Sequence, residues 1–123
     1  MSFAQRMQNL FETTPGCRTI VLGDLEAGVV LRACAEREQG QEHHDALVAE
    51  AATLFDAAVD DSAMPAAGWT EPHLAAIRFT PCEVRLFAAA ADEGADVLCA
   101  RAAPDAALPE LQVGLRALLD HDA

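Results

Sequence analysis

The chain has 123 residues, of which 52% are hydrophobic, and carries a formal net charge of −12 at pH 7 with arginine as its only permanently basic residue. This hydrophobic content excludes a globally disordered chain, and the length predicts a single domain over residues 1–123. The acidic surface repels phosphate backbones and anionic lipids, so we expect no nucleic acid and no membrane as partner, and favour a protein with a basic patch.

Residues 2–13 are predicted to form a first helix. Ser2 is a good N-cap, and apolar residues recur at helical spacing from Phe3 to Phe11. Pro15 and Gly16 end the helix, because proline restricts the residue before it and glycine permits a turn.

Residues 18–35 are predicted to form a β-hairpin. Two runs rich in β-branched and aliphatic residues, 19–22 and 29–33, flank a short acidic turn that is bounded by Gly23 and Gly28. The Asp24 side chain is suited to bond back to this turn. A turn centred between residues 25 and 26 would pair Thr19 with Arg32, Val21 with Val30 and Cys17 with Cys34.

Residues 42–60 are predicted to form a second helix with a wide apolar surface. Leu54 lies on the line that points at the sheet, together with residues 47, 51 and 58. Phe55 and Val59 lie beside this line, on the flank that the helix's own sheet is least able to cover. The apolar arc spans roughly 160°, where a helix on one sheet needs little more than about 100°. The surplus favours contact with a second copy of the chain.

Three further strands and a last helix complete the predicted fold. The strands cover residues 73–79, 82–90 and 96–101, and the helix runs from about residue 108 to residue 120. Pro72 precedes the first of these strands, which makes that strand the candidate free edge of the sheet. The order α-β-β-α-β-β-β-α predicts an α+β domain, in which a five-stranded antiparallel sheet carries helices on both faces.

Few residues in the sequence indicate catalysis or metal binding. His43 and His44 are adjacent on a helix and diverge by about 100°, so they are poorly placed to share one ion, and we expect residues 43–45 to be a solvated helix N-terminus. The two serines, Ser2 and Ser62, lack a nucleophile motif, and no phosphate-binding glycine loop occurs. The abundant carboxylates are interpreted as a solubilising surface. We therefore predict no enzyme activity, no metal site and no cofactor.

The four cysteines contain no CxxC pair and lie in or beside predicted strands. We interpret Cys17, Cys34, Cys82 and Cys99 as buried thiols of a reducing compartment. If the predicted hairpin register is correct, Cys17 and Cys34 face each other and could form a disulfide under oxidation. The sequence shows no leader-like apolar segment at the N-terminus and no apolar stretch of membrane-spanning length, so we expect a cytoplasmic location.

These features together resemble the Roadblock (dynein light chain roadblock-type) domain family. The resemblance rests on the segment 16–24 (GCRTIVLGD) followed by 28–31 (GVVL), on the alanine-rich second helix, on the hairpin over residues 83–103 and on the leucine-rich last helix. The first turn departs from the family pattern, because it lacks an Asp-Gly dipeptide. The resemblance implies a roadblock/profilin-like fold.

The resemblance also implies a cytosolic homodimer that acts as a non-catalytic regulator or scaffold, in bacteria often for Ras-like small GTPases. The second helix and the third strand would form the dimer interface. The alternative is a small-molecule sensor or enzyme domain of profilin-like shape, with a pocket between helix and sheet. The residues assigned to the dimer interface are Val48, Ala52, Phe55, Val59, His73, Ala75 and Ile77.

Overall fold

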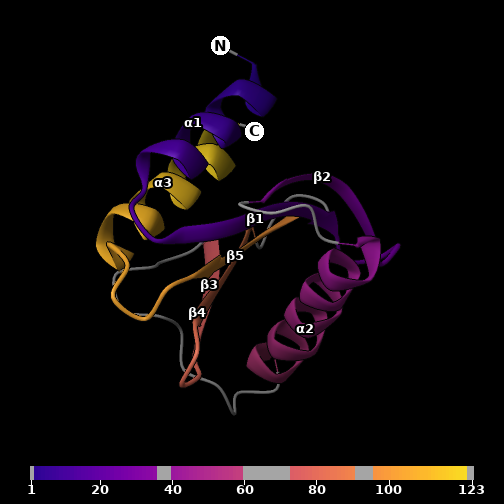
Figure 1. Cartoon of the computed structure of the whole chain (residues 1–123). Helices are drawn as coiled ribbons and strands as arrows, with labels where there is room; N and C mark the ends of the chain where they lie inside the picture. Colours follow the sequence, from indigo (N-terminus) through magenta and orange to yellow (C-terminus); the bar gives the residue numbers. More distant parts are fainter. Residues whose placement is uncertain (1, 36–39, 60–72, 91–95, 122–123) are drawn as a thin grey trace.

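The computed structural model describes residues 2–35, 40–59, 73–90 and 96–121, without the side chains of residues 56–59, 73–75, 90 and 120–121. Its helices and strands follow the predicted order along the chain (Figure 1). They are α1 (Phe3–Thr13), β1 (Cys17–Asp24), β2 (Val29–Ala35), α2 (Gln41–Val59), β3 (His73–Phe79), β4 (Val84–Ala90), β5 (Asp96–Ala102) and α3 (Leu108–His121).

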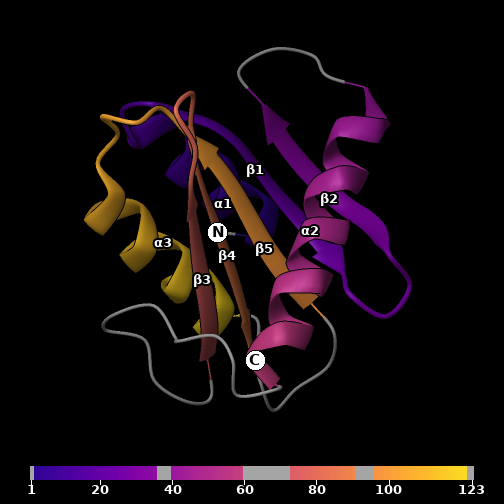
Figure 2. The ribbon, with the colours of Figure 1, turned by 90° about the horizontal axis from the view of Figure 1, so that it is seen from below.

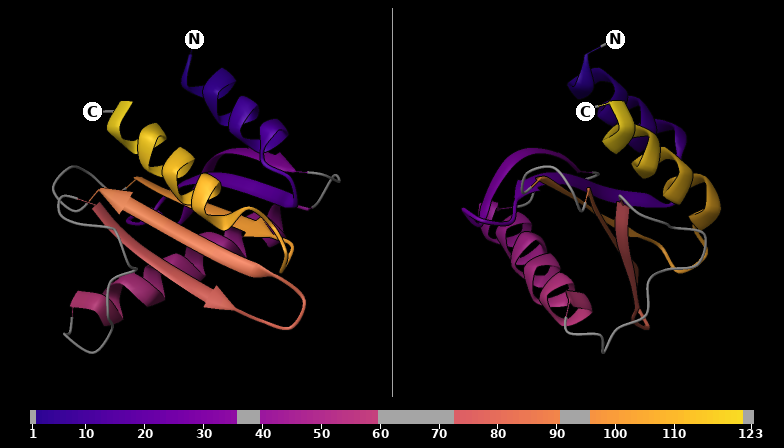
Figure 3. Two further views of the ribbon diagram at one scale, coloured as in Figure 1. Left: turned by 90° about the vertical axis from the view of Figure 1, so that its left-hand side faces the viewer. Right: turned by 180° about the vertical axis from the view of Figure 1, so that it is seen from behind.

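The five strands form one antiparallel sheet in the order β2-β1-β5-β4-β3. Helices α1 and α3 lie side by side on one face, and α2 crosses the other face alone (Figures 1 and 2). Both ends of the chain lie on the side of α1 and α3 (Figure 3). The predicted α+β class, with helices on both faces, is therefore confirmed. So is the position of residues 73–79 at a sheet edge, since β3 and β2 are the outer strands.

Local sequence signals explain where α1 begins and ends. The Ser2 Oγ accepts a hydrogen bond from the Gln5 backbone N–H at 3.2 Å, and the Gln5 side chain accepts one from the Ser2 N–H at 3.0 Å. This reciprocal capping box satisfies two of the donors that a helix start leaves open. After the helix, Gly16 turns the chain into β1 with φ = 84°, a left-handed conformation that favours glycine.

The hairpin between β1 and β2 forms as predicted, but its predicted register is wrong. Thr19 lies opposite Ala35, and Cys34 lies opposite Ile20 rather than Cys17. The turn is centred between residues 26 and 27, because Asp24 pairs with Val29, and within the turn the Gly28 N–H donates to the Asp24 carbonyl at 2.8 Å. A bulge between Leu22 and Gly23 then shifts the register by one more residue. The expected Asp24 turn bonds are confirmed, with Oδ1 accepting from the N–H groups of residues 26 and 27.

Gly23 was expected to begin the turn, but it lies inside β1 and is buried against α2. A Cβ at this position would lie only 2.5 Å from Cγ2 of Val48 on α2. The missing side chain therefore lets the helix approach the sheet closely at this point. Gly28 supplies the turn conformation instead, with φ = 69°.

Each face of the sheet has its own hydrophobic cluster. The cluster under α1 and α3 includes Met7, Ile20, Leu98, Leu111 and Leu115. The cluster under α2 includes Val21, Leu47, Val48, Ala51, Phe55, Phe87, Val97 and Cys99. Because both faces of the sheet are covered, β5 is buried along most of its length instead of alternating between buried and exposed residues.

Candidate functional site

Three arginines on neighbouring strands form a row across the α2 face of the sheet. Arg78 of β3 lies directly opposite Arg85 of β4, and Arg85 lies directly opposite Arg101 of β5. Like charges that face each other on adjacent strands destabilise a sheet. The row therefore requires carboxylates close by, and two glutamates occupy that position.

Glu83 is the more buried of the two, with 5% of the residue exposed. It accepts hydrogen bonds from Arg101 Nε and Nη2, both at 2.8 Å, and from Arg85 Nε at 2.7 Å. Arg18 approaches the same carboxylate at 3.9 Å. The turn before β4 holds Glu83 in place, since its backbone N–H donates to Thr80 Oγ1 at 3.1 Å.

The arginines keep Glu83 ionised in this buried position. Hydrogen bonds from Arg101, followed by those from Arg85, lower the pKa of Glu83 to about 2 from its usual value of 4.5, against the opposing effect of burial. The same contact raises the pKa of the Arg85 guanidinium. Glu83 and these arginines are therefore charged together throughout the neutral range.

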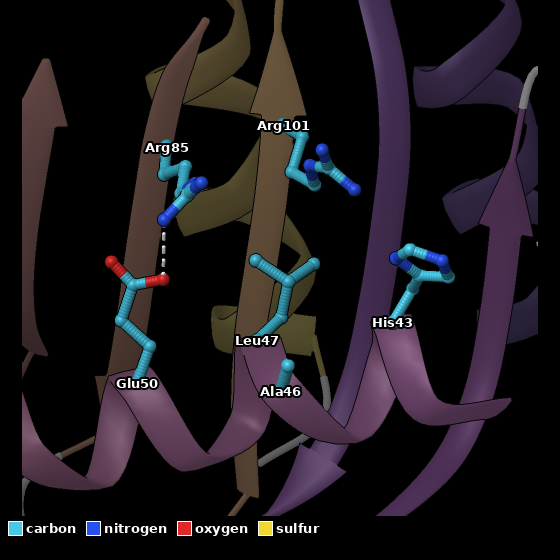
Figure 4. A pocket seen from close by; sticks show the side chains of 6 residues that line it. All are labelled: His43, Ala46, Leu47, Glu50, Arg85 and Arg101. Carbon is cyan, nitrogen blue, oxygen red and sulfur yellow. Dashed lines mark hydrogen bonds and ion pairs between the residues drawn. The ribbon is translucent and has the colours of Figure 1, made fainter. Parts of the chain in front are cut away.

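Glu50 extends the network from the sheet to α2. Its Oε1 accepts a hydrogen bond from Arg85 Nη1, and its Oε2 accepts one from Arg78 Nη1, both at 2.9 Å (Figure 4 draws the Arg85 pair). Arg85 thus bridges the carboxylates of Glu50 and Glu83. These contacts attach α2 to β3 and β4 at the charged end of the sheet.

A cavity of about 140 Å³ lies between this row and the first turns of α2. Figure 4 shows His43, Leu47 and Glu50 rising from the helix toward the strands that carry Arg85 and Arg101. The cavity is lined by His43, Ala46, Leu47, Glu50, Arg85 and Arg101.

The four predicted interface residues whose side chains are described do not lie together on one surface. Val48 and Phe55 are buried by their own chain, with 1% and 6% of each residue exposed. The prediction that Phe55 lies on the uncovered flank of α2 is therefore wrong. Leu54, which was predicted to point to the core, packs against the cluster under α2 but is only partly buried. α2 is rotated about its own axis relative to the predicted orientation. Val48 packs against Gly23, so the side of α2 that carries Val48 faces the sheet.

The remaining interface residues have different positions. Ala52 is partly exposed on α2. Ile77 packs against the cluster under α1 and α3, on the opposite face of the sheet from Val48. The side chains of Val59, His73 and Ala75 lie outside the described residues. The dimer interface stays a prediction, and the assigned residues require revision at Val48 and Phe55.

The histidines and cysteines differ in part from expectation. His43 is exposed, but His44 is buried with 8% of the residue exposed, so its predicted solvation is wrong. Cys82 is exposed, whereas Cys17, Cys34 and Cys99 are buried as predicted. Burial raises the pKa of Cys17 to about 11 and the pKa of Cys99 to about 12, so these thiols are protonated at neutral pH.

Among the described residues there is neither a cluster suited to a metal ion nor a helix suited to a membrane. Within residues 2–35, 40–59, 73–90 and 96–121, no three histidine, cysteine or acidic side chains gather closely enough to hold a metal ion. No helix in the same ranges combines the length and the apolar character needed to cross a membrane.

Sequence reasoning missed the network of arginines and glutamates. The interpretation of all carboxylates as solubilising surface is wrong for Glu83, which is buried. A signal was present, because Arg85 and Arg101 lie inside strands of a sheet predicted to have helices on both faces. Such a charge must be paired or reach water, and only the register shows that the two residues are neighbours.

Comparisons with known proteins identify the fold. No protein-family model and no curated protein matches the sequence. A Roadblock/LC7 domain from Streptomyces avermitilis superimposes with a TM-score of 0.71 at 15% identity, over 95% of this chain and 91% of that one. MglC from Myxococcus xanthus superimposes with a TM-score of 0.65 at 8% identity, over 98% of this chain and 96% of that one. The chain therefore has the fold of a Roadblock/LC7 domain.

Proposed function

We propose that the protein is a non-catalytic regulator or scaffold of the roadblock type, which acts in the cytoplasm as a homodimer and binds a Ras-like small GTPase. The observation that carries this proposal is the fold likeness, which covers 95% of the chain and 91% of a Roadblock/LC7 domain. The sequence resemblance described above points to the same class of protein independently. Another protein with a basic patch would also fit the acidic surface of this chain.

The free edge of β3 and the outward side of α2 support a dimer. Among the described strands, β3 pairs with β4 alone, and an outer strand of this kind can offer backbone groups to a second copy. Ala49 and Thr53 are exposed on α2, and Ala52 is partly exposed. Small side chains allow two helices to approach closely, and these three residues replace Val48 and Phe55 in the proposed interface.

The proposal is tested by binding of a small GTPase from the same genome. We expect calorimetry to detect a complex whose affinity differs between the GDP-bound and GTP-analogue-bound GTPase, because regulators distinguish the two states of the switch segments. Hydrolysis assays with and without the protein then show whether it affects turnover. If none of the small GTPases of that genome binds in either nucleotide state, the proposed partner is wrong.

The alternative reading, a small-molecule sensor or enzyme domain, receives less support from the cavity under α2. That cavity has a volume of about 140 Å³, whereas sites for drug-sized ligands occupy roughly 300–1,000 Å³. Native mass spectrometry of the purified protein separates the two readings. A stoichiometric bound nucleotide or metabolite would favour the sensor, and a spectrum of the protein alone favours the scaffold.

A further inference from the structure

We propose that the outer edge of β2 binds an extended segment of a partner protein that carries both apolar and basic side chains. The segment adds to the sheet as a sixth strand, a mode in which backbone hydrogen bonds give affinity and side chains give specificity. β2 and β3 lie at opposite edges of the sheet, with three strands between them (Figure 2). A contact on β2 therefore leaves β3 free for the proposed dimer, and the two proposals do not depend on each other.

β2 exposes apolar side chains at positions where an unpaired edge strand usually carries charged ones. Among the described residues, four large apolar side chains are exposed to solvent, and two of them are Val29 and Leu31 of β2, with 45% and 53% of each residue exposed. Arg32 is the only charged residue between Val29 and Ala35. Edge strands that stay unpaired usually carry charges or proline, which prevent another chain from adding to the sheet. The composition of β2 is instead typical of a strand that gains a partner.

The bulge in the first hairpin determines which part of β2 is regular. Gly23 lies opposite Val30 and Leu22 lies opposite Arg32, so Leu31 has no opposite residue on β1. Bulges of this kind re-aim a side chain, which accounts for the exposure of Leu31. Beyond the bulge, residues 32–35 pair with residues 19–22 in regular antiparallel register. The bulge therefore interrupts only the first half of β2, and the second half keeps the regular geometry that an added strand needs.

The charges around β2 favour a basic partner over a second copy of the chain. The segment that leads into β2 carries Asp24 and the exposed Glu26. Burial raises the pKa of the Cys34 thiol, Arg32 lowers it and Glu12 of α1 raises it, so these two charged groups also lie near the strand. Three carboxylates and one arginine therefore lie beside β2. A second copy, with a net charge of −12, would bring the same carboxylates to this edge, whereas lysine or arginine side chains of a partner meet opposite charges there.

A matched pair of substitutions tests this edge. Leu31→Lys places a positive charge in the exposed apolar part of β2. Val113→Lys makes the same change of charge at an exposed apolar side chain of α3, which packs over β4. Both side chains are exposed in the wild type, so both variants should fold, and their amide NMR spectra check this.

The probe is a short peptide of alternating valine and lysine, about as long as β2 and with blocked ends, which is titrated into the isotope-labelled protein. We expect saturable shifts of the amide signals of residues 29–35 in the wild type and in Val113→Lys, and an affinity at least tenfold weaker in Leu31→Lys. A peptide of alternating valine and glutamate should bind at least tenfold more weakly than the lysine peptide. Replacing the central valines of the lysine peptide by proline removes N–H groups that a strand donates, and should abolish the saturable shifts.

The proposed site is wrong if the lysine peptide gives no saturable shifts at β2, or if the wild type and both variants respond alike, since the peptide would then bind the acidic surface by charge alone. Equal affinity for the glutamate peptide would contradict the basic character of the partner. If the signals of β2 shift when the protein alone is diluted, a second copy occupies the edge and the proposal is also wrong. None of these results bears on GTPase binding, which is measured separately.

Discussion

The two faces of the sheet are built differently. On one face, α1 and α3 lie side by side over an apolar cluster that includes Ile20, Leu98 and Leu111 (Figure 1). On the other face, α2 alone covers a smaller cluster around Phe87 and Cys99. Beyond the helix, toward the end of the sheet, this second face carries the arginine row with Glu50 and Glu83.

The difference shows how a single helix leaves room for charge. Two helices cover their face over an apolar cluster, and the Nε of Arg6 on α1 is the only guanidinium nitrogen among the described residues that is buried there without a hydrogen-bond partner. One helix leaves a corner that water can reach, where arginine stems cover the sheet while their head groups remain partly exposed. The side chain of Arg85 is 29% exposed and that of Arg101 is 23% exposed. The α2 side is therefore the one on which these paired charges of the sheet reach solvent.

We expect the largest loss in the free energy of unfolding when a charge is introduced into the apolar half of the α2 face. Phe55→Asp should unfold the domain, at a cost of several kcal/mol, because Phe55 is buried by its own chain and a carboxylate there would have no partner. Leu54→Asp is the matched control and should cost clearly less, since Leu54 is only partly buried. Urea unfolding followed by circular dichroism measures both. Equal losses would show that the orientation of α2 described above is incorrect.

A smaller but substantial effect is expected in the charged half of the same face. Glu83→Gln should lower the free energy of unfolding by roughly 3–5 kcal/mol, because it leaves the arginines without their most buried carboxylate. Glu26→Gln, in the exposed turn of the first hairpin, should change it by less than about 0.5 kcal/mol. If the two variants are equally stable, the network of arginines and glutamates does not contribute to the stability of the fold.

The pH dependence of stability should carry the signature of Glu83. Its pKa is about 2 in the folded protein, below the usual 4.5, so its contribution is complete above the unfolded value and is lost as the pH falls from about 5 to about 2. The expected loss is on the order of 3 kcal/mol. Urea titrations at several pH values measure it. In Glu83→Gln the acid-induced loss should be smaller by that amount, and identical pH profiles would contradict the assignment.

The order of elements was predictable because it depends on local signals. The Ser2 cap, the positive-φ glycines at 16 and 28 and the alternation of apolar residues each act over a few residues. Their physical meaning does not depend on distant parts of the chain. They were sufficient for the fold class and for most element bounds.

The register of the hairpin and the rotation of α2 were not predictable from such signals. A single bulge moves the partner of every residue beyond it, and Gly23 reads as a turn residue until α2 is seen to pack on it. The arginine row was equally unpredictable, because Arg85 and Arg101 become neighbours only through the pairing of β4 with β5. Pairing over such distances depends on tertiary packing, which local patterns do not encode.

A dimeric regulator of the roadblock type, as we propose this protein to be, must have twice the mass of one chain in solution. Size-exclusion chromatography with light scattering, at chain concentrations from about 1 to 100 µM, should give twice the chain mass of 13.0 kDa at the upper end. A charge on the outward side of α2, Thr53→Arg, should shift this equilibrium toward the monomer while leaving the melting temperature of the monomer unchanged. A mass of 13.0 kDa across the whole range would contradict the claim.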